Sequence, residues 1–138
     1  MSRDDLDGVK AAWEAISAND FDRLIELVDP EVEFTSLVAE AEAVTYRGHA
    51  GVRRWWDSIR EIFTEFWAKD TELREVGDRI LAQIRLCGTV QDMKVEQTIW
   101  QVLKVRDGRV VSWRVFRTES EALEAVSLSE QDARSGSN

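Results

Sequence analysis

The sequence is poor in the residues that most often cross-link, kink or ligate in small proteins. It holds one cysteine, one proline, one histidine and one tyrosine among 138 residues. A single cysteine, Cys87, excludes an internal disulfide and suits a reducing cytoplasm, which is the compartment we expect. No apolar run is long enough to span a bilayer, and no charged-then-apolar leader opens the chain, so we expect no membrane association.

Positive charge is also scarce. The chain has 18 Lys and Arg against 27 Asp and Glu, a net charge of −9. Five acids and one arginine between residues 119 and 138 place −4 of this total at the end of the chain. An acidic body argues against nucleic acid or an anionic membrane as partner. By length we expect one domain over residues 1–127, followed by a polar, Ser-rich, flexible tail over residues 128–138.

Three segments carry the three- and four-residue apolar spacing of amphipathic helices. The first covers residues 4–18. A short second helix is expected over residues 21–28, with Asp20 as its N-cap and Pro30 ending it, because proline excludes its predecessor from the helical region. The longest helix is expected over residues 50–67, where tryptophan, isoleucine and phenylalanine form a broad apolar stripe.

Strands are expected where β-branched and aromatic residues dominate. Residues 31–36 alternate apolar and polar. Residues 69–76 and 79–90 follow, joined at a tight turn that contains Gly77. Residues 95–116 carry the strongest hairpin signal, an Asp-Gly pair between two β-rich arms.

Two less regular segments remain. Residues 37–47 lack periodicity and are expected to form a loop that carries Glu40 and Glu42. The sequence Thr-Glu-Ser-Glu beginning at Thr118 is a capping box for a final helix that reaches about residue 126.

The hairpin register decides which side chains meet. We expect a three-residue loop at 106–108 with Gly108 in the left-handed region. This register keeps Lys104 and Arg114 together on the wetter face, whereas a two-residue turn would flip one arm relative to the other. One face then holds Gln97, Ile99, Gln101, Leu103, Val111, Trp113 and Val115, and the other holds Thr98, Trp100, Val102, Lys104, Val110, Ser112, Arg114 and Phe116.

Helices segregated from long antiparallel hairpins predict an α+β fold. A twisted sheet of long hairpins curls. We therefore expect a cone-shaped, curved and mainly antiparallel sheet wrapped around the long helix, with the N-terminal helices closing the cone.

Five segments in this order resemble the SnoaL-like group of the nuclear-transport-factor-two-like superfamily. The resemblance covers about residues 4–126 and implies the cone-shaped fold. It leaves activity open, because the superfamily includes isomerases, cyclases, dehydratases, epoxide hydrolases and non-catalytic binding domains. The matching segments are residues 18–22 (Ala-Asn-Asp-Phe-Asp), 29–34 (Asp-Pro-Glu-Val-Glu-Phe), 46–52 (Tyr-Arg-Gly-His-Ala-Gly-Val), 106–111 (Arg-Asp-Gly-Arg-Val-Val) and 121–125 (Glu-Ala-Leu-Glu-Ala).

The known catalytic residues of this superfamily do not carry over. The positions of the ketosteroid isomerases' tyrosine and general base fall on Ala12 and Phe34, and their protonated aspartate falls on Trp100 or Gln101. Enolisation needs a base near the α-proton and a donor at the oxyanion, and neither remains. The cyclases are similar in relying on a deep acidic residue. The epoxide hydrolases use an Asp-Arg-Asp set, and Arg85 has no aspartate two residues away.

Three titratable residues are the remaining catalytic candidates. Glu40 and Glu42 could act as acid or base if the loop folds inward, or they could be solvated. His49 could shuttle a proton, or it could open the long helix and bond locally. We expect no metal and no cofactor, because one histidine with scattered carboxylates makes a poor metal site. We expect Cys87 to be a small buried hydrophobe.

A pocket for a small, mainly apolar molecule is our first hypothesis. Gln101 would supply its polar group, because a buried amide must find partners. The second hypothesis is a non-catalytic interaction module whose aromatic residues fill the cone. Trp100 and Phe116, on the outer face, suggest a homodimer through the sheet. The residues that we expect to line the pocket are Trp13, Phe34, Tyr46, Trp55, Gln101 and Trp113.

Overall fold

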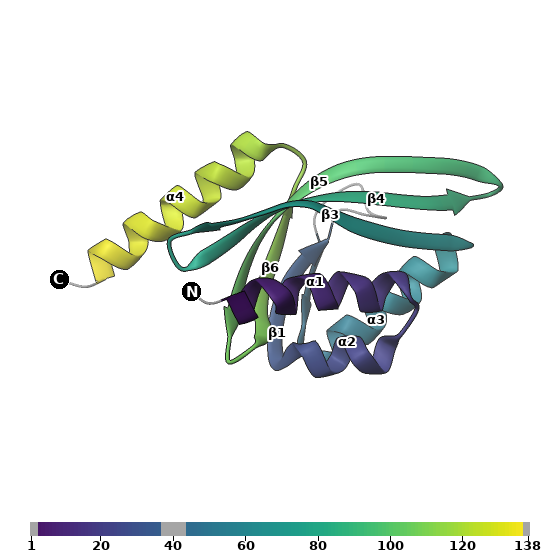
Figure 1. Cartoon of the computed structure of the whole chain (residues 1–138), viewed down its shortest axis with the longest axis horizontal. Coiled ribbons are helices and arrows are strands. Elements are labelled where there is room, and N and C mark those ends of the chain that lie inside the picture. Colours follow the sequence, from purple (N-terminus) through teal and green to yellow (C-terminus); the bar gives the residue numbers. More distant parts are fainter. Residues whose placement is uncertain (1–2, 37–43, 137–138) are drawn as a thin grey trace.

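The structure is a computed structural model that describes residues 3–36 and 44–136. Its elements alternate little: helices come first and last, and most strands are consecutive (Figure 1). No helix in these two ranges is both long and apolar enough to cross a membrane. The elements in chain order are α1 (Arg3–Ser17), α2 (Phe21–Leu27), β1 (Val28–Ser36), β2 (Val44–Arg47), α3 (Gly48–Ile62), β3 (Glu65–Val76), β4 (Arg79–Val90), β5 (Met93–Arg106), β6 (Arg109–Phe116) and α4 (Glu119–Gly136).

The strands form one six-stranded curved sheet in the order β2-β1-β6-β5-β4-β3. Neighbouring strands are antiparallel except for β1 and β6, which are parallel. Helices α1, α2 and α3 lie on one side of the sheet, which we call the inner face, and α4 lies on the other, the outer face (Figure 1). The predicted α+β class with a curved, mainly antiparallel sheet around helices is therefore confirmed.

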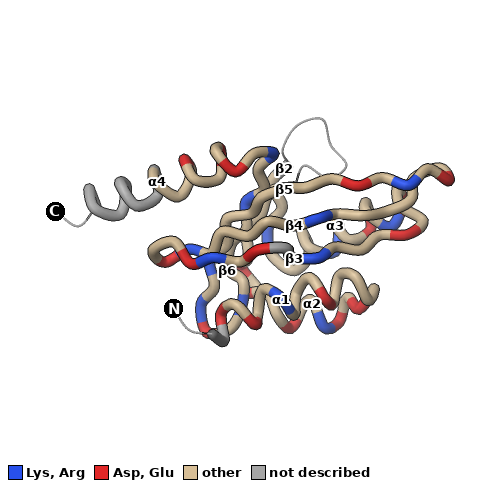
Figure 2. The backbone as a smooth tube through the Cα atoms, turned by 45° about the horizontal axis from the view of Figure 1, so that its top comes forward, with Lys and Arg blue, Asp and Glu red and all other residues tan. Residues whose placement is uncertain are grey.

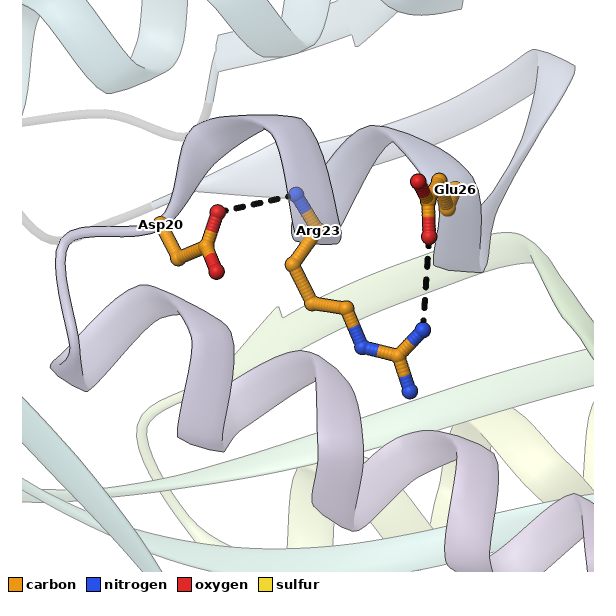
Figure 3. A network of polar contacts seen from close by, with 3 residues as sticks. All are labelled: Asp20, Arg23 and Glu26. Atoms are coloured by element: carbon orange, nitrogen blue, oxygen red, sulfur yellow. Dashed lines mark hydrogen bonds and ion pairs between the residues drawn. The ribbon is translucent and has the colours of Figure 1, made fainter.

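The helix α2 begins where the sequence predicts. Asp20 is its N-cap, and the Asp20 Oδ1 atom accepts a hydrogen bond of 3.1 Å from the backbone N–H of Arg23. The Arg23 side chain in turn lies 3.3 Å from Glu26 (Figure 3). These exposed contacts fix the entry of a helix only seven residues long, which buries Leu24.

The long helix is shorter than predicted. It ends at Ile62 rather than at residue 67, and Phe63 has extended backbone angles of −101° and 127°. The strand β3 begins at Glu65 rather than at residue 69, so that Phe66 and Trp67 pair with β4. The backbone N–H and C=O groups of β4, which is twelve residues long, need hydrogen-bond partners along their whole length, and the twelve residues of β3 supply them. This strand pairing outweighs the helical spacing of Phe66 and Trp67 in the sequence.

The turn of the central hairpin differs from the predicted three-residue loop, but most residues of the hairpin lie on the predicted faces. Arg106 pairs with Arg109, so the turn has two residues, Asp107 and Gly108, with φ of 55° and 77°. Positive φ at both central positions is the type I′ pattern. A β-bulge between the Lys104–Ser112 and Val105–Val110 pairs then returns the residues beyond it to the expected faces, with partners two residues away from the expected ones.

The bulge accounts for the misplaced valine. Leu103 pairs with Trp113 and Gln101 pairs with Val115, all on the predicted face, although the expected loop would have placed Gln101 beside Trp113; Val110 pairs with Val105. Val110 is 1% exposed and belongs to the inner core, although the sequence analysis placed it on the outer face. An unrecognised bulge shifts by one residue every side chain between it and the turn.

Two further differences concern the ends of the predicted loop and of the last helix. Val44–Arg47 forms the edge strand β2 instead of a loop. The capping box is observed, because the Glu121 N–H donates to Thr118 Oγ1 at 3.2 Å. The helix α4 continues to Gly136, ten residues beyond the predicted end.

The helix α4 covers the outer-face aromatic residues that we expected to be exposed. Its buried residues Ala122 and Val126 pack with Leu81 and Val102 in a second, smaller core. Trp100 and Phe116 are partly buried against this core. This pair is therefore not the open surface on which the predicted dimer contact was based.

Candidate ligand-binding site

The interior of the cone is centred on a buried polar pair. Trp13 on α1 donates its Nε1–H to Gln101 Oε1 on β5 at 3.1 Å. Gln101 is 1% exposed, and it is the one buried polar residue in the described part of the chain. Gln101 therefore faces the helices, as the register predicts, and its carbonyl oxygen already has a protein donor.

Four of the predicted pocket residues form one aromatic cluster beside this pair. The ring centroids of Phe34 and Trp113 lie 4.1 Å apart, and those of Phe34 and Tyr46 lie 5.1 Å apart. Trp55 meets both Phe34 and Trp113 edge-on at about 6 Å. All four are at most 8% exposed. The structure thus brings the predicted residues together by packing them on one another, and their role in ligand binding stays a prediction.

The catalytic candidates are placed differently. Glu40 and Glu42 lie outside the described residues. His49 is the second residue of α3, and its Nε2 lies 3.1 Å from the backbone oxygen of Val28 on β1. This distance fits donation by an Nε2–H tautomer. The contact is the local structural role that the sequence analysis weighed against proton transfer.

The β4–β5 hairpin extends past the helices at one end of the sheet (Figure 1). A groove opens there, between the end of α3 and the hairpin. Its volume is about 410 Å³, within the range of about 300 to 1,000 Å³ that is usual for small-molecule sites. We call it the end groove. Its lining residues are Ile62, Phe63, Phe66, Leu86, Cys87, Val90, Val95, Glu96 and Gln97.

The end groove exists because α1 stops short of the sheet's end. Ser17, the last residue of α1, exchanges 2.8 Å hydrogen bonds with the backbone N–H and C=O of Ala68. Among the described residues, Ile62 and Phe63 at the end of α3 lie against the inner face beyond Ala68. There the Phe63 ring lies directly on Gly88, where a Cβ atom would come within 2.6 Å of Phe63 Cδ1. Glycine at this position lets the ring sit low and leaves the groove open.

The apolar walls of the groove reach solvent. Ile62 is 41% exposed and Val95 is 40% exposed. Phe63 and Phe66 stand side by side with ring centroids 5.1 Å apart. Partly exposed aliphatic and aromatic groups around a concave surface are typical of a binding site rather than of a folded core.

Three polar residues line the groove, but only Gln97 directs its side chain to the inner face; Cys87 and Glu96 stand in one cross-strand row with Trp67 on the outer face. Gln97 offers both a donor and an acceptor. Glu96 forms an exposed ion pair with Arg85 at 3.1 Å. Burial, and next the charge of Glu96, raise the pKa of the Cys87 thiol, while Arg85 partly offsets this. A protonated thiol is a weak nucleophile, so the groove has the chemistry of a binding site more than of a covalent catalyst.

A second hollow is less suited to a ligand. Its volume is about 600 Å³, and it lies where β1, β2 and β6 meet. Its polar lining includes Glu33, Asp29 and Arg106. Glu33 already pairs with Arg47 at 2.6 Å, and Asp29 lies 4.0 Å from Arg106.

The sequence analysis missed the end groove because it misplaced two aromatic residues and did not use one glycine. Phe63 and Phe66 were placed on one helical stripe, whereas they lie on a helix cap and on a strand. Gly88 is the signal that could have revealed it, because a glycine inside a strand often marks the close approach of another group.

Comparison with known proteins agrees with this fold. Residues 9–113 match the model of the SnoaL-like domain. No curated protein matches the chain. An NTF2-like protein of unknown function from Burkholderia pseudomallei superposes with a TM-score of 0.74 at 19% identity, covering 91% of this chain and 98% of that one.

Two further solved structures carry functional names. A putative polyketide cyclase from Sinorhizobium meliloti has a TM-score of 0.65 at 24% identity, covering 80% of this chain and 94% of its own. An LEH-like epoxide hydrolase from M. tuberculosis has a TM-score of 0.67 at 16% identity, covering 89% of each chain. At these identities the likeness shows the fold alone. Because the family model spans most of the chain, this protein belongs to the SnoaL-like domain family.

Proposed function

We propose that this protein binds a small, mainly apolar molecule in the end groove. The observation that carries the proposal is the open apolar hollow of about 410 Å³ between the end of α3 and the β4–β5 hairpin. It combines aromatic and aliphatic walls with one neutral amide, Gln97. Such a site suits a flat molecule with a polar group at one edge.

The packed interior supports placing the ligand at the end of the cone. Trp13 and Gln101 satisfy each other, and Phe34 is in ring contact with Trp113. A ligand entering among the six interior residues would have to break these contacts. A ligand in the end groove would only cover Ile62 and Val95, which are already exposed.

A non-catalytic role is favoured by the groups that line the groove. Among the lining residues, Glu96 and Cys87 are the titratable ones. Glu96 is held in an ion pair, and the raised pKa of Cys87 keeps its thiol protonated. His49 opens α3, about 20 Å along the helix axis from the groove at its other end. The named activities of the structural neighbours are therefore a second proposal, which depends on Glu40 and Glu42, outside the described residues.

The test uses N-phenyl-1-naphthylamine, a neutral dye that fluoresces when it leaves water. We expect the wild-type protein to bind the dye, and Val95→Arg and Ile62→Arg to weaken binding at least about tenfold by filling the groove with charge. Leu123→Arg is the control, because Leu123 is similarly exposed, at 37%, but lies on α4.

Two results would overturn the proposal. One is equal binding of the dye by the control and by both groove variants. The other is native mass spectrometry of freshly purified protein that detects a retained ligand whose occupancy the groove variants do not change. Binding lost only in variants of Trp55 or Trp113 would instead place the ligand in the interior.

A further inference from the structure

The end groove is a trough that follows the strands of the β4–β5 hairpin. Its floor consists of inner-face residues in cross-strand rows, and each row lies two residues further along the strands than the one before. A strand rises about 3.4 Å per residue, so the first and the third row are about 14 Å apart. From the core toward the turn, the rows are Leu86–Gln97, Gly88–Val95 and Val90–Met93.

The open part of the floor lies on the β5 side of the trough. The Phe63 ring lies on Gly88 and covers the middle of the β4 side. Phe66 stands beside Phe63, so the two rings form one wall along the trough. On the β5 side, Val95 is 40% exposed and Met93 is 69% exposed. A hollow of about 410 Å³ spread over about 14 Å has a cross-section of about 30 Å², which accommodates one hydrocarbon chain or one flat ring.

The two ends of the trough differ. The next row toward the core is Ile84–Ile99, and both side chains are at most 1% exposed, so the trough is closed at that end. At the other end, the hairpin turn is open to solvent. Figure 2 shows charged positions at the tip of this hairpin, and in the sequence these include Asp92 and Lys94. Apolar contact therefore stops at Met93, which sets the usable length of the trough.

We infer that the end groove takes a single unbranched hydrocarbon chain with a neutral polar group at one end. The inference rests on the proposed function and adds the shape of the ligand. The polar group lies beside Gln97, which offers a donor and an acceptor, and the chain crosses Val95 toward Met93. An extended chain advances about 1.2 Å per bond, so a length of about 14 Å accommodates about ten to twelve carbon atoms.

The polar group is neutral because the described lining offers no charged side chain on the inner face. These lining residues include no lysine, arginine or histidine. Their one carboxylate, Glu96, points to the outer face and pairs with Arg85. A charged head group would therefore lose hydration without gaining a partner. An anion would also be repelled by a protein that carries a net charge of −9.

The test is displacement of the dye from the full chain by straight-chain alcohols from butan-1-ol to tetradecan-1-ol. We expect each added methylene to tighten binding about two- to fourfold until the chain has about ten to twelve carbon atoms, and to add nothing beyond that length. Adamantan-1-ol holds as many carbon atoms as decan-1-ol in a compact cage, and we expect it to bind at least about tenfold more weakly. Decanoate should also bind at least about tenfold more weakly than decan-1-ol.

Two variants locate the ends of the chain. Met93→Asp places a charge at the last apolar row, so the longest chain that still gains affinity should be shorter by one row, about 7 Å or five to six carbon atoms. Gln97→Leu should weaken binding of every alcohol by the same factor and leave this limit unchanged. Leu123→Asp is the control for Met93→Asp, because Leu123 is also exposed, at 37%, but lies on α4. It should change neither the affinities nor the limit.

The outcomes separate this inference from the proposed function. Dye binding that Val95→Arg abolishes, together with equal affinities for decan-1-ol and adamantan-1-ol, would refute the extended chain and keep the groove as a site. A chain-length limit that Met93→Asp does not move would also overturn the inference. A wild-type protein that binds no dye would refute the proposed function, and the inference with it. Retention of dye binding by Met93→Asp shows that this variant is folded.

Discussion

The buried pair of Trp13 and Gln101 allows the sharpest test of the interior. Replacing Gln101 by leucine keeps much of the side-chain volume but removes the acceptor of the 3.1 Å hydrogen bond. Trp13 is 5% exposed, so water cannot replace the lost partner. A buried donor left without a partner costs about 1–3 kcal/mol.

This cost is measurable by urea unfolding. For a denaturant dependence of about 2 kcal/mol per molar urea, a loss of about 2 kcal/mol lowers the midpoint by about 1 M. The matched control is Gln97→Leu, the same substitution on the same strand and the same face, at an exposed position. We expect it to change the free energy of unfolding by no more than about 0.5 kcal/mol.

A double-mutant cycle isolates the hydrogen bond from the change in packing. Trp13→Phe removes the donor, and the double variant Trp13→Phe/Gln101→Leu leaves neither partner unpaired. The double variant should therefore be about 1 kcal/mol more stable than the sum of the two single changes predicts. Strict additivity, or a Gln101→Leu protein as stable as the wild type, would refute the view that this pair is a satisfied, water-excluded contact.

Three further outcomes follow from local geometry. Gly88→Ala should destabilise the fold by about 1–3 kcal/mol in urea unfolding and reduce dye binding, because the new Cβ would come within 2.6 Å of Phe63. Adding Phe63→Leu to this variant should recover part of the stability and part of the dye binding. No recovery would show that the Phe63 ring is not the obstacle. Asp20→Ala should cost about 1 kcal/mol through loss of the 3.1 Å cap on α2, and a change below about 0.3 kcal/mol would contradict that role. Alkylation of Cys87 should require a higher pH in the folded than in the unfolded chain, because folding raises the pKa of the thiol, and identical pH–rate profiles would contradict the shift. Since the folded thiol binds its proton more tightly, Cys87 lowers the free energy of unfolding as the pH rises above the pKa of the unfolded chain.

Local signals in the sequence were enough for most of the elements. The Asp20 cap, the Gly77 turn and the capping box at Thr118 each depend on a few adjacent residues, and each is observed. The alternation of β5 likewise sufficed to place Gln101 and Leu103 toward the helices and Trp100 away from them. These features are set by backbone hydrogen bonding and side-chain periodicity within one element, so they are readable without tertiary structure.

Features that depend on two elements were not readable. The end of α3 at Ile62 is decided by the length of β4, which takes Phe66 and Trp67 as strand partners. The turn is one residue shorter than predicted, and a bulge in β6 returns the residues beyond it to their predicted faces. Val110 lies between the bulge and the turn, so it joins the core, although its spacing from Trp113 predicts the opposite face.

The composition and periodicity of this chain determined an α+β cone with an aromatic interior. Only the tertiary structure decided that those aromatic residues pack on one another, that α4 covers Trp100, and that the open surfaces lie at the β3–β4–β5 end. The physical reason is that exposure depends on where a neighbouring element stops. Because α1 ends at Ser17, opposite Ala68, the sheet beyond that point is left to Phe63, Val95 and solvent.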